Sequence, residues 1–207
     1  MPANPTNTLN LAEVCRDTRA LGPGRRYAIW VQGCPFRCAG CLAVQWRSQQ
    51  PKRLVPVARL AEDILNVAGL EGLTLSGGEP MLQAEACHQL IEQIRCRRPR
   101  TTLMVYTGFT LEELRAGGDA ARLGLLAAVD VLIDGPYEQA RNDNLGLRGS
   151  TNQRVHFLSD VYRDLGESHF TLQPRQVELH FRQEDLFMVG VPPTGLDQLI
   201  EEVTSQA

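Results

Sequence analysis

The 207-residue sequence lacks the features that mark membrane-spanning, exported or nucleic-acid-binding chains. No run approaches the roughly 18 apolar residues of a spanning helix. Its start, MPANPTNTLNLAEVCRD, has neither the basic residues nor the apolar core of a secretory signal. A net charge of -3 gives no general attraction to nucleic acid or to an anionic membrane. We therefore expect a cytoplasmic globular protein with no nucleic-acid or membrane partner.

The sequence also lacks a fourth cysteine beside the three in GCPFRCAGC (33–41). A disulfide uses cysteines in pairs and a closed structural zinc site uses four ligands, so neither accounts for three. Cys34, Cys38 and Cys41, at the spacing C-x3-C-x2-C, leave one coordination position of a metal centre open. Clustered cysteines in a cytosolic protein favour metal binding or catalysis over disulfides. The other cysteines stand apart and are interpreted as small apolar residues: Cys15, Cys87 and Cys96.

Two kinds of metal centre are compatible with three thiolates. A [4Fe–4S] cube bound by three cysteines leaves one iron open to a substrate, a cofactor or water. Alternatively, zinc takes three thiolates and a histidine that the fold brings close. The candidate histidines are all remote in sequence: His88, His156, His169 and His180. The spacing favours the iron–sulfur cube, because a tight loop brings its cysteines together.

Apolar runs rich in β-branched residues alternate with stretches of helical periodicity. Four runs are predicted to be buried strands that each end at glycine: 27–33, 72–78, 102–108 and 129–135. Three segments between them are predicted to be helical: 57–70, 82–97 and 110–129. The last has a break at Gly117–Gly118 and a capping box formed by Thr110 and Glu113. This alternation predicts an α/β fold, a partial (β/α)6 barrel of mostly parallel strands.

The C-terminal part of the sequence has a different pattern. Residues 176–181 and 185–191 flank a short polar link and predict an antiparallel β-hairpin, and residues 195–204 predict a final helix. We therefore expect a core formed by residues 1–158 and a C-terminal appendage formed by residues 159–207.

Unusual short motifs follow each of the four predicted strands. The cysteine loop follows the first, SGGEP (76–80) the second, YTG (106–108) the third and DGPY (134–137) the fourth. The carboxyl ends of parallel strands are where α/β folds build their sites, so we expect one shared site. In SGGEP, two glycines let the backbone approach a ligand, and Glu79 places a carboxylate at the rim.

These motifs together resemble the radical S-adenosylmethionine superfamily. Within it, the likeness is greatest to the small activating enzymes of glycyl-radical enzymes, above all those of anaerobic ribonucleotide reductase. It covers roughly residues 9–158. The segments that carry it are GPGRRYAIWVQGCPFRCAGC (22–41), LSGGEPMLQ (75–83), YTGFTLEEL (106–114), VDVLIDGPY (129–137) and LRGSTNQR (147–154).

The resemblance implies an oxidoreductase with a [4Fe–4S] cluster and S-adenosylmethionine as cofactors. Such enzymes cleave S-adenosylmethionine reductively to methionine and a 5′-deoxyadenosyl radical, here to generate a glycyl radical on a partner enzyme. A flavodoxin- or ferredoxin-like protein is implied as electron donor. Two alternatives remain: a radical enzyme that modifies a small molecule or peptide, and a metal- or cluster-binding module without catalysis.

The resemblance also implies a role for each matching residue. Cys34, Cys38 and Cys41 match the cluster ligands, which are both the metal site and the catalytic centre. The remaining matches are cofactor contacts: Gly77, Gly78 and Glu79 at the methionine amino end, Gly40 and Leu42 beside the adenine, and Thr107 and Asp134 at strand ends. Asn152 and Arg154 either close the site or only make hydrogen bonds within their loop.

Overall fold

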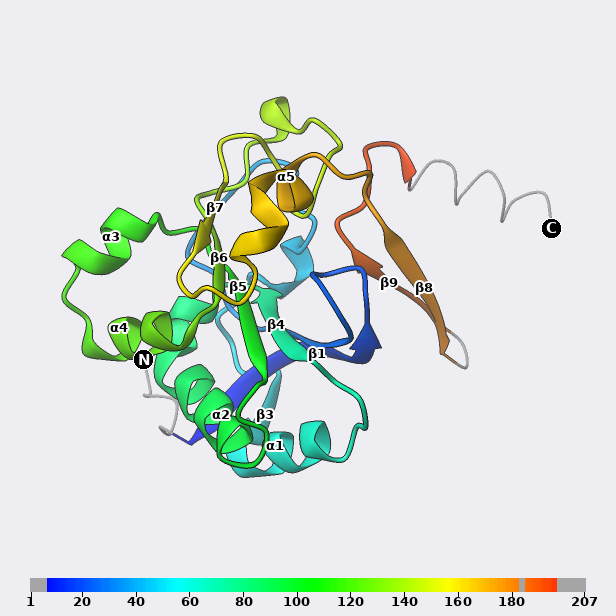
Figure 1. Ribbon diagram of the computed structural model, residues 1–207. Coiled ribbons are helices and arrows are strands. Elements are labelled where there is room, and N and C mark those ends of the chain that lie inside the picture. Colours follow the sequence, from blue (N-terminus) through cyan, green and yellow to red (C-terminus); the bar gives the residue numbers. More distant parts are fainter. Residues whose placement is uncertain (1–6, 183–184, 197–207) are drawn as a thin grey trace.

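A computed structural model describes residues 7–182 and 185–196 of the chain (Figure 1). Its strands are β1 (Thr8–Thr18), β2 (Arg26–Val31), β3 (Arg53–Pro56), β4 (Gly72–Gly77), β5 (Thr102–Tyr106), β6 (Val131–Asp134), β7 (Arg154–Phe157), β8 (Val177–Arg182) and β9 (Asp185–Gly190). Its α-helices are α1 (Val57–Leu65), α2 (Ala84–Arg97), α3 (Leu111–Ala116), α4 (Ala120–Ala128) and α5 (Gly166–Thr171). Four single-turn 3-10 helices are η1 (Val44–Trp46), η2 (Pro80–Gln83), η3 (Gln139–Arg141) and η4 (Arg163–Leu165).

Seven of these strands form one sheet in the order β3-β1-β2-β4-β5-β6-β7. The central strands β2, β4, β5 and β6 run parallel, whereas β1, β3 and β7 pair antiparallel with their neighbours. Strands β8 and β9 form a separate antiparallel hairpin, as predicted. The α/β class is therefore confirmed, with four parallel strands in the described residues. The partial (β/α)6 barrel stays a prediction.

The four predicted strands correspond to β2, β4, β5 and β6, and the predicted helices to α1, α2 and the α3–α4 pair. The break between α3 and α4 lies where expected, with Gly118 in the left-handed region at φ 63°. The capping box of α3 is also confirmed, because Thr110 and Glu113 each bond the other's backbone N–H. The predicted helix at 195–204 lies mostly outside the described residues.

Strands β1, β3 and β7 and helix α5 were not anticipated. In β1 the pairing with β2 shifts register between Leu11 and Glu13 and again between Cys15 and Thr18. Such bulges break the two-residue alternation by which a strand is recognised in sequence. Strands β3 (RLVP) and β7 (RVHF) have only four residues each and, unlike the equally short β6 (VLID), they are not continuous buried runs.

The core lies on both faces of the sheet, as β2 illustrates. Tyr27, Ile29 and Val31 pack with α1, α2 and α4, whereas Trp30 points to the opposite face. There it packs with Val189 of β9 in a second cluster. Figure 1 shows the β8–β9 hairpin beside β1, away from α1 and α2. The hairpin thus covers part of the sheet face opposite α1, α2 and α4, and Phe170 of α5 covers another part of it.

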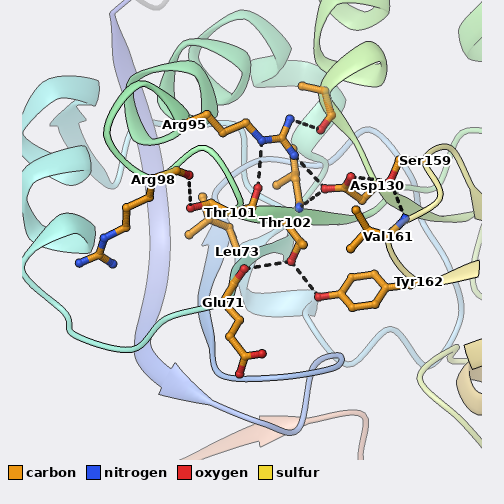
Figure 2. A network of polar contacts seen from close by, with 12 residues as sticks. Glu71, Leu73, Arg95, Arg98, Thr101, Thr102, Asp130, Ser159, Val161 and Tyr162 are labelled. Atoms are coloured by element: carbon orange, nitrogen blue, oxygen red, sulfur yellow. Dashed lines mark hydrogen bonds and ion pairs between the residues drawn. The ribbon is translucent and has the colours of Figure 1, made fainter.

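A polar network joins the amino ends of the parallel strands (Figure 2). Arg95 forms an ion pair with Asp130 at 2.8 Å, and its guanidinium also donates to the carbonyl oxygen of Thr101. The Asp130 carboxylate accepts from Leu103 N–H and from the Ser159 hydroxyl. The segment after β7 is therefore bonded directly to the sheet. The proposed division of the chain near residue 158 stays a prediction.

Candidate functional site

A cavity of about 780 Å³ lies at the carboxyl ends of the parallel strands. Its walls come from the cysteine loop, the turn after β4, the ends of β5 and β6, and the segment that includes β9. Nine of the predicted site residues line it: Cys34, Cys38, Gly40, Cys41, Leu42, Gly77, Gly78, Glu79 and Thr107. The structure therefore brings together residues that are up to 73 positions apart in the sequence, from Cys34 to Thr107.

The three clustered cysteines are free and partly exposed on the cavity wall. Within residues 7–182 and 185–196, no three histidine, cysteine, aspartate or glutamate side chains form a compact metal-binding group. The three thiols share one wall of the cavity. All four histidines fall within these ranges and none lines the cavity. A zinc site completed by a histidine therefore receives no support from the fold.

The surroundings of Cys34 keep its thiol protonated in the absence of a metal ion. Burial raises the pKa of its thiol to about 11; a hydrogen bond from the backbone of Phe36 opposes this, and the nearby Glu79 carboxylate adds to it. The thiol therefore keeps its proton at neutral pH unless a metal ion displaces it. Three sulfur donors on one wall are the ligand set of an iron–sulfur cluster, so the residues present fit that group.

The GGEP turn packs directly on the cysteine loop. Gly78 N–H donates to the Val31 carbonyl at 2.7 Å, and Glu79 N–H donates to the Gly33 carbonyl at 2.8 Å. A Cβ at Gly78 would lie 2.2 Å from that Gly33 oxygen, and Gly77 has φ 97°, which L residues rarely adopt. The two glycines are therefore required for the contact between the two loops, in addition to any contact with a ligand.

The carboxylate of Glu79 was expected at the site's rim, but the residue is only 1% exposed. It accepts hydrogen bonds from Met81 N–H, Gly108 N–H and the Thr107 hydroxyl. Burial raises its pKa to about 7 although these hydrogen bonds act in the opposite direction. Two predicted cofactor contacts, Glu79 and Thr107, are thus bonded to each other at 2.8 Å and join the ends of β4 and β5.

Asp134 is the one predicted contact that does not line the cavity. Its side chain is fully buried and accepts from Leu111 N–H, at the start of α3, and from Arg154. His156 lies 3.0 Å from the same carboxylate, and Arg154 also binds the exposed Glu112. In this structure Asp134 and Arg154 fasten α3 to β6 and β7, and a cofactor contact by Asp134 stays a prediction. Asn152 donates to the Pro136 carbonyl within its loop.

Comparisons with known proteins agree with the chemistry of this cavity. A family model described as a 4Fe-4S single cluster domain matches residues 20–156. The anaerobic ribonucleoside-triphosphate reductase-activating protein of Vibrio cholerae is 35% identical over 145 residues, which are 65% of this chain and 89% of that protein. The chain belongs to this family of activating proteins.

Other members of the family are similarly close. The activating proteins of Escherichia coli K12 and of Enterobacteria phage T4 are each 34% identical over 144 residues. Those residues are 66% and 67% of this chain and 91% and 88% of the two relatives. The crystal structure of QueE from Escherichia coli covers 50% of this chain and 53% of its own, at 16% identity and a TM-score of 0.38, too remote to support an argument.

One wall of the cavity comes from beyond residues 20–156, the stretch that matches the 4Fe-4S single cluster domain. Phe187 and Met188 line it, followed by residues 190–195. Hydrogen bonds fasten this segment to the loop after η3: Thr194 N–H donates to the Asn144 side chain at 2.7 Å. No sequence motif marked these residues, because their place depends only on contacts distant in sequence.

The described residues also hold no helix long and apolar enough to cross a membrane.

Proposed function

We propose that the chain is a radical S-adenosylmethionine enzyme that generates a glycyl radical on an anaerobic ribonucleotide reductase. The observation that carries the proposal is that three cysteines and the GGEP turn line one cavity, in a chain of the activating-protein family. Its cofactors are a [4Fe–4S] cluster and S-adenosylmethionine. When bound, they supply an electron and a 5′-deoxyadenosyl group whose radical removes a hydrogen atom from glycine.

The side chains and backbone of the cavity have separate tasks in this proposal. Cys34, Cys38 and Cys41 hold the cluster. The backbone of the turn at Gly77 and Gly78 receives the methionine end of the nucleotide. That backbone is held in place from behind, because Glu79 is hydrogen-bonded to the start of η2 and to the end of β5. The segment from Gly40 to Leu42 lies beside the adenine.

Aromatic side chains on the cavity wall exclude water from the reacting atoms. Trp30 and Trp46 pack with ring centroids 5.9 Å apart, and Trp30 meets Phe187 edge-on at 5.4 Å. Phe36 packs edge-on against Phe109 at 4.9 Å. A free radical needs such a dry site, because the alkyl radical must reach its target hydrogen before any side reaction.

Anaerobic reconstitution with iron and sulfide tests this proposal. The protein should take up iron into a brown chromophore and, with dithionite, release 5′-deoxyadenosine from S-adenosylmethionine. Added reductase from the same organism should then show a glycyl radical by electron paramagnetic resonance. A Cys38→Ala variant is the matched control: it should release no 5′-deoxyadenosine and should produce no glycyl radical on the reductase.

Each alternative function predicts a different result in this experiment. A protein that binds a cluster or zinc and forms no 5′-deoxyadenosine would be a binding module, and the proposal would be wrong. Formation of 5′-deoxyadenosine without any glycyl radical on the reductase would indicate a small molecule or another peptide as substrate. A flavodoxin- or ferredoxin-like donor is then tested by whether it replaces dithionite.

A further inference from the structure

The outward face of the β8–β9 hairpin is apolar along its length. In the register of the pair, Phe181 lies opposite Leu186 and Leu179 lies opposite Met188. Because residues opposite each other share a face, these four side chains form one surface, here called the hairpin face. Phe181 is 86% exposed, and Leu179 and Leu186 are 44% and 42% exposed. The exposed fraction of Phe181 is the greatest of any large apolar residue in the described part of the chain.

The opposite face of the hairpin is the one that packs on the hydrophobic core. Phe187 and Val189 pack on Trp30, and Glu178 accepts from Arg19 N–H at 2.7 Å. An antiparallel sheet with one face on the core normally presents polar residues on its other face. An apolar outer face is therefore not needed for folding, and contiguous exposed apolar side chains of this kind mark interaction sites.

The hairpin face continues into the mouth of the cavity. Met188 belongs to the face and also lines the cavity, and the chain then runs along the cavity wall through residues 190–195. This wall is firmly held: Arg175 donates to the carbonyl oxygens of Pro192, Arg148 and Gly149. A molecule seated on the hairpin face therefore lies beside the cavity.

We propose that the hairpin face is the docking surface for the polypeptide whose glycine is oxidised. This inference rests on the proposed function, since only a protein substrate must bring a backbone glycine to the cavity. A flexible loop gains little binding energy in a small cavity, whereas an aromatic anchor on an adjacent apolar patch provides affinity and orientation. A second copy of the chain seated on this face would instead cover the mouth and compete with the substrate.

Replacement of Phe181 by glutamate tests the docking surface. The matched control is Val161→Glu, because Val161 is 58% exposed and lies at the other end of the sheet, near Asp130 (Figure 2). Phe181→Glu should weaken anaerobic binding of the separately purified reductase by about tenfold or more, as expected for a lost aromatic anchor. Glycyl radical formation should fall equally at low reductase concentration and recover at high concentration. Release of 5′-deoxyadenosine without reductase should not change.

The outcomes separate this inference from the proposed function. Equal binding and radical formation by Phe181→Glu and wild type would overturn the docking surface. So would a wild-type dimer that Phe181→Glu dissociates without affecting reductase binding, because the face would then serve a second copy. If wild type releases no 5′-deoxyadenosine, the proposed function fails, and the binding comparison still decides the surface. The thermal unfolding midpoint of each variant, compared with that of wild type, shows whether the variant is folded. Leu179→Ser is a milder change on the same face, to be used if Phe181→Glu does not fold.

Discussion

Replacement of Asp134 by asparagine distinguishes a structural role from a cofactor contact. The change keeps the size of the side chain but removes its charge. An asparagine oxygen in the place of Oδ2 can still accept from Leu111 N–H, Arg154 Nη2 and His156, whereas the amide nitrogen in the place of Oδ1 would face the N–H donor of Arg154 Nε. The hydrogen bond from Arg154 Nε is lost, and the bonds to the other oxygen lose the charge of their acceptor; a hydrogen bond to a charged group is worth about 1.5–3 kcal/mol. Arg154 is 46% exposed and keeps its contact with Glu112, so the expected loss is about 2 kcal/mol.

Anaerobic urea denaturation of the reconstituted protein measures this loss, and titration with S-adenosylmethionine measures cofactor affinity in the same samples. We expect a lower midpoint and unchanged affinity. Glu112→Gln, which removes the exposed partner of the same arginine, is the control and should alter stability far less. An unchanged midpoint together with clearly weaker cofactor binding would refute the structural role and favour the cofactor contact.

The pH dependence of this variant is a second readout. Burial alone would raise the pKa of Asp134, but hydrogen bonds from Arg154 and Leu111 N–H and the nearby His156 lower it below 3.8. A lowered pKa means that the carboxylate stabilises the fold above pH 3.8 and ceases to do so as the pH falls further. The difference in stability between wild type and Asp134→Asn should therefore be constant near neutrality and shrink in acid.

Three further predictions concern the cavity. Alanine at any one of the clustered cysteines should abolish the visible absorbance of the reconstituted cluster, whereas alanine at the exposed Cys96 should leave it unchanged. Gly78→Val should lower both iron content and stability, the latter by about 3 kcal/mol, because the new side chain displaces Gly33 beside the cysteine loop; iron analysis and urea denaturation check this. Burial raises the pKa of Glu79 from 4.5 to about 7, so its ionisation costs stability as the pH rises through that range. Glu79→Gln should remove this pH dependence of the unfolding free energy.

The central parallel strands and the motifs at their ends could be predicted because both leave local signals. A buried parallel strand is a short apolar run, and its carboxyl end is where glycine and cysteine motifs gather. The glycines of the turn were likewise recognisable, although their contact with Gly33 was not, since it joins loops more than 40 residues apart. Strand β1 escaped prediction because its bulges interrupt the alternation of apolar and polar residues.

The orientation of individual side chains at the strand ends could not be predicted. Thr107 and Asp134 occupy similar positions after β5 and at the end of β6, yet one lines the cavity and the other lies beneath α3. The difference depends on Arg154 and Leu111, which reach Asp134 through the packing of β7 and α3 on β6. The cavity wall formed by Phe187, Met188 and residues 190–195 could not be predicted either. No spacing of residues in the sequence indicates that this segment lies against the cysteine loop's cavity.

The order of the two walls along the chain has a consequence for synthesis. The cysteine loop (33–41) emerges from the ribosome well before the segment around residues 187–195. Until then the three thiols face solvent on an unfinished surface, open to iron delivery and equally to oxidation. We therefore expect cluster insertion to be safest once the segment around residues 187–195 has folded against the cysteine loop.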